Sequence, residues 1–184
     1  MFCGKVMPVR ESETYLGDQL TNNPSESFFK TIQQKKGLTM ILLQEFRVTI
    51  DDVKSHCLGG LKTGIEIWNL AVVPFLFNNC EIWVDIPKKA INLLNHLQYS
   101  FLVSLFGSSS GCPTPILYWD TGLLTPENYI IMKTLIMYHY LMLLPCETLA
   151  KQVFTSQTEN NMPGLVSEFK LILSELQIVY DPSL

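Results

Sequence analysis

The fold is indicated most directly by residues 25–53, which read SESFFKTIQQKKGLTMILLQEFRVTIDDV. Apolar residues recur there mostly at spacings of three and four, the period of an amphipathic helix: Phe28, Phe29, Ile32, Met40, Leu43, Phe46, Ile50 and Val53. Gly37 interrupts the pattern, and a glycine inside a helix costs about 1 kcal/mol relative to alanine. We expect one long helix that begins at Pro24 or Ser25 and ends near His56. We expect it to be loosened at Gly37.

A second helix is predicted over residues 61–77, after the Gly59-Gly60 pair. One stripe repeats at spacings of four and three: Leu61, Ile65, Trp68, Val72 and Phe75. Other apolar residues fill the remaining faces, and a helix that is apolar all round is a buried one. Pro74 removes a backbone donor, a defect of about 3 kcal/mol in an ideal helix. We expect a kink between Leu70 and Pro74 rather than a break.

Four more helices follow from their start signals and apolar stripes. Asp85 is the expected cap of the first, with Pro87 in its first turn and an inner face from Ala90 to Leu105. Residues 107–115 are a loop by composition. Thr125-Pro126-Glu127 combines a hydroxyl cap, a proline and an acid, so it starts a helix that runs to Pro145. Two shorter helices are predicted over residues 146–157 and 163–177.

The amino end reads as extended chain. Residues 2–9 and 13–20 are expected to be two short strands of a hairpin around Arg10-Glu11-Ser12. The predicted fold is therefore mainly α, with a short N-terminal β-hairpin followed by a bundle of about six helices. We divide it into a hairpin over residues 1–22 and a helical domain over residues 23–184.

The chain is poor in charge. Charged residues make up 16% of it, against about 25% in a typical domain, and no Lys or Arg lies between Lys89 and Lys133. Such a region is either deeply buried or pressed against a partner. The net charge of −4 argues against a general nucleic-acid binder. Residues 1–62 nevertheless carry eight Lys and Arg against seven Asp and Glu, so any phosphate contact is expected in this first third.

Cysteine usage and hydropathy indicate a compartment. The five cysteines (Cys3, Cys57, Cys80, Cys112 and Cys146) form no zinc-ligand spacing and no disulfide framework. No apolar signal core follows a basic start, so we expect an intracellular chain, nuclear or cytoplasmic, with reduced thiols. The apolar stretches at 65–77 and 129–144 contain polar residues and fall short of the ~20 residues that span a membrane. We expect no membrane contact and no cofactor.

No complete active site is evident. Asp51-Asp52 suggests a polymerase metal pair, but adjacent acids at helical spacing are more often a solvated face. None of the three histidines (His56, His96 and His139) has the set of carboxylate or cysteine partners that a catalytic or zinc site requires, and Ser108-Ser109-Ser110 is no nucleophile elbow. Trp68, Trp83 and Trp119 are interpreted as core anchors rather than base-stacking residues. Asp120 and Gly122 are expected in a turn, with Gly122 in the left-handed conformation.

The best nucleic-acid candidate is Lys35-Lys36 beside Gln33-Gln34, with Lys30 one turn earlier and Arg47 three turns later. Lysines along one helix edge can neutralise phosphates of a duplex. A solvated polar face is the alternative interpretation.

A run of short motifs resembles one family. Thr14-Tyr15-Leu16-Gly17-Asp18 resembles the primer-grip turn of non-LTR (LINE-type) retrotransposon reverse transcriptases, and five later segments resemble, in order, the region downstream of their polymerase core: Gly64 to Trp68, Val73 to Trp83, Trp119 to Gly122, Leu149 to Val153 and Asn161 to Val166. The likeness covers roughly residues 5–178. The resemblance implies the palm end, the thumb and a helical extension. It also implies that the catalytic aspartates are absent, because Thr49 stands where the family has an aromatic residue and Asp51-Asp52 follows the turn instead of preceding it.

In the family, a thumb helix tracks the template–primer duplex and the Tyr-Leu-Gly turn steadies the primer end. The resemblance therefore implies nucleic-acid binding through Tyr15, Leu16, Gly17, Lys35 and Lys36. The implied partners are an RNA–DNA or DNA duplex, bound weakly by the N-terminal third, and the missing palm and fingers region.

Two functions from different classes stay open. The first is a fragment of a retrotransposon-derived reverse transcriptase that is not active alone. The second is a helical protein-interaction module derived from it. A small enzyme is disfavoured because no acid–base pair or nucleophile constellation is present.

Overall fold

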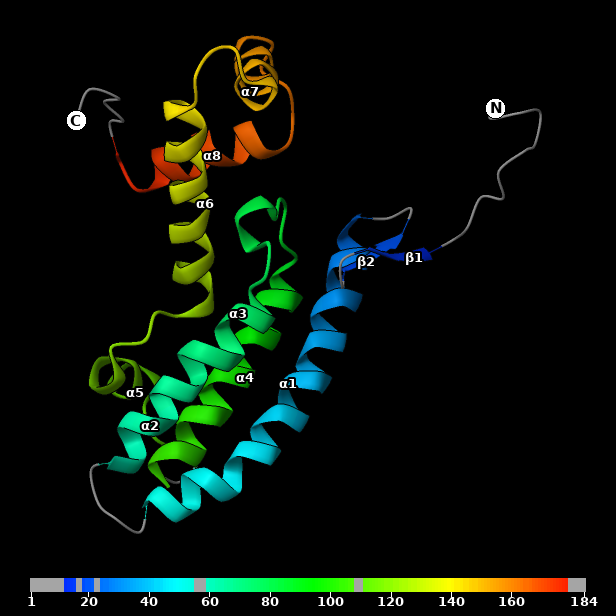
Figure 1. Ribbon diagram of the computed structural model, residues 1–184. Helices are drawn as coiled ribbons and strands as arrows, with labels where there is room; N and C mark the ends of the chain where they lie inside the picture. The colour runs from blue at the N-terminus through cyan, green and yellow to red at the C-terminus, as the bar shows by residue number, and fades with distance from the viewer. Residues whose placement is uncertain (1–11, 16–17, 22–23, 55–58, 108–110, 179–184) are drawn as a thin grey trace.

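The computed structural model describes residues 12–178 apart from 16–17, 22–23, 55–58 and 108–110, with side chains at 28–46 and from residue 60 onward. The protein is mainly helical (Figure 1). Its helices are α1 (Pro24–Lys54), α2 (Gly59–Ile67), η1 (Trp68–Val72), α3 (Val73–Leu76), η2 (Cys80–Ile82), α4 (Lys88–Phe106), α5 (Thr114–Thr121), α6 (Pro126–Leu143), α7 (Leu149–Glu159) and α8 (Leu165–Glu175).

The amino end differs from the sequence prediction. Two antiparallel strands, β1 (Ser12–Tyr15) and β2 (Asp18–Thr21), pair Tyr15 with Asp18 and Ser12 with Thr21. The stretch predicted as one strand over 13–20 is thus two strands that pair with each other; residues 2–9, predicted as its partner strand, lie outside the described residues. The prediction was wrong because it treated 13–20 as one extended segment, although Gly17 lies at its middle and glycine favours chain reversal.

The long helix α1 is confirmed, and it runs unbroken through Gly37 rather than loosening there. Met40, predicted on its inner face, is 49% exposed. An inner stripe with a regular four-three spacing explains this: Phe28, Ile32, Lys35, Thr39, Leu42 and Phe46. Met40 lies about 100° around the helix from Thr39 and so falls outside this stripe.

The segment from Gly59 to Leu76 stays helical through Pro74, as predicted. Its irregularity is the π-helical turn η1, in which the amide of Val73 donates to the carbonyl of Trp68. Proline has no amide hydrogen, so one carbonyl a turn before Pro74 loses its partner. A wider π turn is a common way to accommodate such a defect inside a helix.

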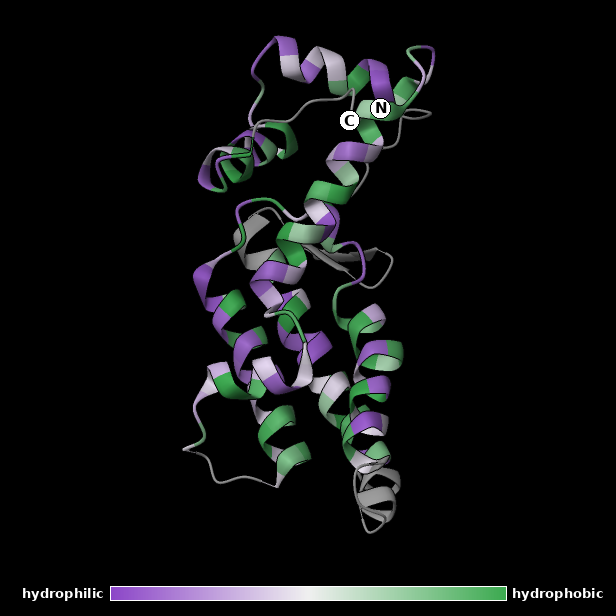
Figure 2. Ribbon diagram, turned by 90° about the vertical axis from the view of Figure 1, so that its left-hand side faces the viewer, coloured by the Kyte–Doolittle hydropathy of each residue, from purple (hydrophilic) through white to green (hydrophobic). Residues whose placement is uncertain are grey.

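The core lies between α1, the α2–α3 segment and α4, which run side by side in Figure 1. Trp68 stacks on Phe101 with ring centroids 4.6 Å apart, and Phe28 meets Trp83 edge-on at 4.7 Å. Gly64 allows α2 to approach α4 closely, because a β-carbon there would lie 2.2 Å from Leu105 Cδ1. Figure 2 shows hydrophobic and hydrophilic residues alternating along these helices.

Helix α6 connects this bundle to a second, smaller core. Its far end packs with α7 and α8 around Phe154, Val166 and Phe169, and Tyr138 of α6 touches both phenylalanine rings. The ammonium of Lys151 donates to the carbonyls of Leu141 and Met142 at 3.3 and 2.7 Å. A lysine at the last carbonyls of a helix satisfies groups that otherwise have no partner.

The helix boundaries test several predicted signals. Thr125 caps α6 by accepting from the amide of Asn128 at 3.2 Å, as predicted. Asp85 does not cap α4; it has a positive φ of 51°, and Pro87 is the residue before the helix. The helix α5 was not predicted, although the left-handed conformation of Gly122 at its end was. Among the described helices, none is long and apolar enough to cross a membrane.

Candidate nucleic-acid interface

The predicted basic pair of α1 does not lie on one outer edge. Lys35 occupies the inner stripe, three residues after Ile32 and four before Thr39, and it is only 6% exposed. A polar residue can hold such a position when its apolar stem is packed and its charged end finds partners. The sequence prediction for Lys35 was wrong because Lys35 is in phase with the apolar stripe that begins at Phe28, and the prediction did not take this phase into account.

The charged end of Lys35 has partners from the α3–η2 connection. Its Nζ donates to the carbonyl oxygen of Asn78 at 3.4 Å and lies 5.6 Å from the ring centroid of Trp83. An ammonium over an indole face is attracted by the negative face of the ring. Lys35 therefore joins α1 to the α3–η2 connection, and in this arrangement it is not available to neutralise a phosphate.

The outer face of α1 contains other polar side chains. Lys30, Gln33 and Gln34 are exposed, and Lys36 is half-buried at the border of the inner stripe. Among Lys30, Lys35 and Lys36, whose side chains the structure describes, Lys30 is thus the one on the outer face. The side chain of Arg47 lies outside the described residues.

Of the Tyr-Leu-Gly motif, the structure describes the backbone of Tyr15. This residue is the last of β1 and pairs with Asp18, while Leu16, Gly17 and the side chain of Tyr15 are outside the described residues. Strand β2 packs against α1, so the strand pair lies at the amino end of the long helix (Figure 1). Tyr15 therefore lies in the same part of the molecule as the start of α1.

The described side chains form no recognisable catalytic or metal centre. They contain no group of three or more His, Cys, Asp or Glu residues that could hold a metal ion. The backbone of Asp51-Asp52 is helical, within α1. Burial, together with the neighbouring Glu81, raises the pKa of the Cys80 thiol to about 12, so this thiol is not an activated nucleophile.

The tryptophans divide into two kinds. Trp68 and Trp83 are core residues, as predicted, whereas the prediction for Trp119 was wrong, because it is 88% exposed on α5. The turn expected around Trp119 is instead a short helix, and its outer side carries the indole. His96 lies on α4 with its Nδ1 3.0 Å from Ser100 Oγ.

Comparisons with protein-family models, curated proteins and solved structures yield no match to this chain.

Proposed function

We propose that this chain is the thumb-like part of a non-LTR retrotransposon reverse transcriptase, a non-catalytic region that contacts a template–primer duplex. The sequence motifs provide the resemblance, and one structural observation supports it. A strand pair whose first strand ends at Tyr15 packs against a 31-residue helix that also contacts α2, α3 and α4. A strand end followed by a helix with one free face is the arrangement that the proposed role needs.

The free face of α1 is polar and carries one exposed lysine. Lys30 is exposed, Lys36 is half-buried at the border of this face, and the exposed Gln33 and Gln34 lie between them in sequence. Amides and ammonium groups both donate to phosphate oxygens, and such contacts position a duplex without reading its sequence. With the chain at a net charge of −4, we expect weak binding that depends strongly on salt.

The duplex test compares two lysine pairs. Binding of a fluorescent RNA–DNA duplex is measured by anisotropy across a salt series, for the wild type, for Lys30→Ala with Lys36→Ala, and for Lys88→Ala with Lys89→Ala. Each neutralised phosphate contributes a slope of about −0.9 in log K against log salt. The α1 pair should flatten the slope by roughly two such contributions, and the matched α4 pair should change it little. Equal losses from both pairs would contradict the assignment to α1.

The alternative is a helical protein-interaction module, and exposed apolar side chains favour it. Leu70, Trp119 and Leu149 are 79%, 88% and 76% exposed, and aromatic and apolar residues of this kind are enriched in protein interfaces. Absence of duplex binding at low salt would favour this function. Binding that is insensitive to salt and is lost in Trp119→Ala would do the same.

A further inference from the structure

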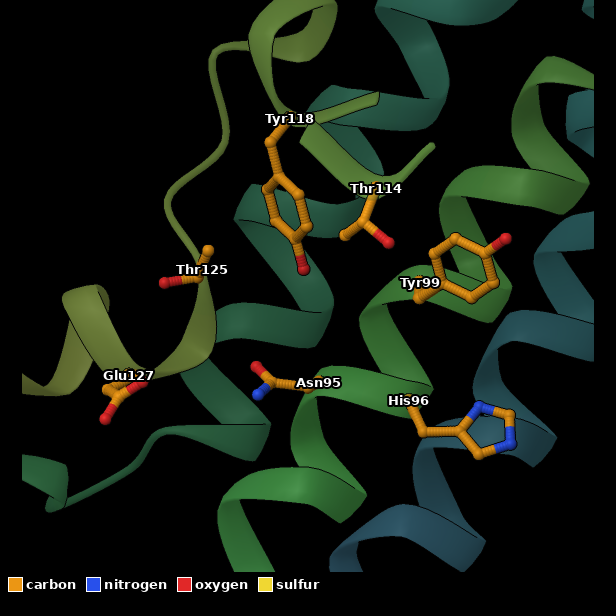
Figure 3. A pocket seen from close by; sticks show the side chains of 7 residues that line it. All are labelled: Asn95, His96, Tyr99, Thr114, Tyr118, Thr125 and Glu127. Atoms are coloured by element: carbon orange, nitrogen blue, oxygen red, sulfur yellow. The ribbon is translucent and has the colours of Figure 1, made fainter. Parts of the chain in front are cut away.

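An open pocket of about 400 Å³ lies where α4 meets the first turns of α5 and α6 (Figure 3). Its size falls within the range of small-ligand sites, about 300–1,000 Å³. All seven lining residues carry a hydrogen-bonding group on the side chain. The pocket is separate from the outer face of α1 and from the strand pair.

Two tyrosine rings of the pocket are held in place by the protein itself. The hydroxyl of Tyr118 donates to Gln98 Oε1 at 3.0 Å, and Gln98, 3% exposed, donates in turn to the carbonyl of Leu124 at 3.1 Å. The hydroxyl of Tyr99 donates to the carbonyl of Cys112 at 3.2 Å. Both rings therefore line the pocket in orientations that exist before any ligand arrives, which lowers the entropic cost of binding.

Three other lining groups keep their hydrogen-bonding capacity for a ligand. Within the part of the chain that the structure describes, the side chains of Asn95, Thr114 and Glu127 make no hydrogen bond or ion pair. Figure 3 shows the amide of Asn95 pointing into the space between Tyr118 and the start of α6, where Thr125 and Glu127 lie. An amide supplies a donor and an acceptor side by side, and an ionised carboxylate only accepts.

The charge of the pocket limits the ligand. Glu127 is its carboxylate, and the sequence has no Lys or Arg between Lys89 and Lys133. An anion is therefore disfavoured, whereas a neutral ring with N–H donors can bond to Glu127. Planar rings gain from contact with tyrosine faces, Asn amides pair with the edge of adenine, and carboxylates accept from the amino group of cytosine.

We propose that this pocket binds an unpaired neutral nucleobase, with Tyr118 contacting the ring and Asn95 and Glu127 bonding its polar edge. This ligand goes beyond the proposed function, because neither a duplex nor a phosphate is needed. The same ring can come from a free nucleoside or from a single-stranded nucleic acid.

The test is a titration of the ¹⁵N-labelled chain with adenosine, guanosine, cytidine and uridine, followed by ¹H–¹⁵N correlation spectra. Ribose alone is the control for the sugar. We expect shifts at α4, α5 and the start of α6 for at least one nucleoside. Loss of one neutral hydrogen bond weakens binding about threefold to tenfold, and this is the effect expected of Asn95→Ala. Glu127→Gln keeps an acceptor but removes the charge that strengthens the bond, so it should weaken binding by a similar factor. Asn92→Ala, one turn away on the exposed side of α4, is the matched control and should leave the affinity unchanged.

The source of the ring is distinguished with a single-stranded hexanucleotide. Tighter binding of the strand than of the nucleoside, lost in the Asn95→Ala and Glu127→Gln variants, supports a base presented by nucleic acid; equal affinity supports a free nucleoside. The proposal is overturned if roughly 10 mM nucleoside causes no shifts, if ribose causes the same shifts, or if the two variants bind as the wild type does. Failure here leaves the duplex result intact, because nucleosides carry no phosphate and the duplex test changes other residues.

Discussion

At the scale of single residues, the feature that most changes the interpretation of this chain is the position of Lys35. Its neighbour Lys36 is half-buried, and Lys30 is exposed, so three lysines close in sequence have three different environments. A helix rotates by about 100° per residue, and two adjacent residues therefore face different directions. Adjacent basic residues on a helix thus cannot be treated as one phosphate-binding unit.

Lys35→Ala should lower the free energy of unfolding by about 1–3 kcal/mol. The change removes a packed stem and leaves the carbonyl of Asn78 without this donor. Lys36→Ala, at the border of the inner stripe, should cost less than half as much. Urea denaturation followed by circular dichroism measures both. Equal stability of the wild type and Lys35→Ala would mean that the lysine is not packed as the structure has it.

At the scale of helices, the contact between α2 and α4 depends on a residue without a side chain. A β-carbon at Gly64 would lie 2.2 Å from Leu105 Cδ1, within the buried core. Gly37 of α1 is exposed, and a β-carbon there would meet nothing within 4 Å. Packing therefore requires a glycine at position 64 but not at position 37, although the sequence alone shows both as glycines inside a helix.

Gly64→Ala should lower the free energy of unfolding by about 1–3 kcal/mol, because an overpacked core forces side chains and helices to shift. Gly37→Ala is the matched control and should raise it by about 0.5–1 kcal/mol, since alanine is the better helix former and nothing opposes its methyl group. Thermal unfolding, followed by the circular dichroism signal of the helices, shows whether each substitution raises or lowers the stability. A stabilised Gly64→Ala variant would contradict the close approach of α2 and α4.

At the scale of the whole molecule, the protonation of a group on α8 depends on burial and on a charge that is distant in sequence. The pKa of Glu168 on α8 is raised, chiefly by burial and further by Asp85 and Glu175. The folded state therefore holds this proton more tightly than the unfolded chain does. The contribution of Glu168 to stability is present below its unfolded pKa and is lost as pH rises through the higher folded value.

Glu168→Gln removes the carboxyl group that titrates, so the variant should not lose this stability as the pH rises. The melting temperature of the variant should exceed that of the wild type at pH 7, and the difference should shrink as the pH falls below 4.5, the ordinary pKa of the group. Glu159→Gln, the same substitution at an exposed position on α7, serves as the matched control. Calorimetry from pH 4 to pH 8 measures the effect. A difference that grows toward low pH would contradict the raised pKa.

The proposed function implies that the chain alone extends no primer. Magnesium or manganese with any template should give no incorporation, because the described residues include no group of three or more His, Cys, Asp or Glu that could hold a metal ion. A gel-based extension assay with labelled primer tests this, with an active reverse transcriptase as the positive control. Template-dependent incorporation that Asp52→Asn abolishes would overturn it and would make Asp51-Asp52 a metal site.

Local sequence signals determined much of the fold. Apolar spacing and caps such as Thr125 were enough to place the helices now seen as α1, α2–α3, α4, α6, α7 and α8, because these signals act within a few residues of the chain. Trp68 and Trp83 were recognisable as core residues from their apolar surroundings. The short helix α5 was missed, because its eight residues carry no clear stripe and follow a loop-like composition.

Only the tertiary structure decided the candidate sites. Whether Lys35 faces a partner or the core depends on the α3–η2 connection, 43 residues away in sequence. The pocket likewise combines side chains from α4, α5 and the start of α6. The hydrogen bond that holds the ring of Tyr118 in place joins it to Gln98, 20 residues away in sequence. The sequence by itself indicated most of the helical segments, since helix formation depends largely on local backbone and side-chain preferences. Which polar groups meet is set by how the helices pack, and that information is not local.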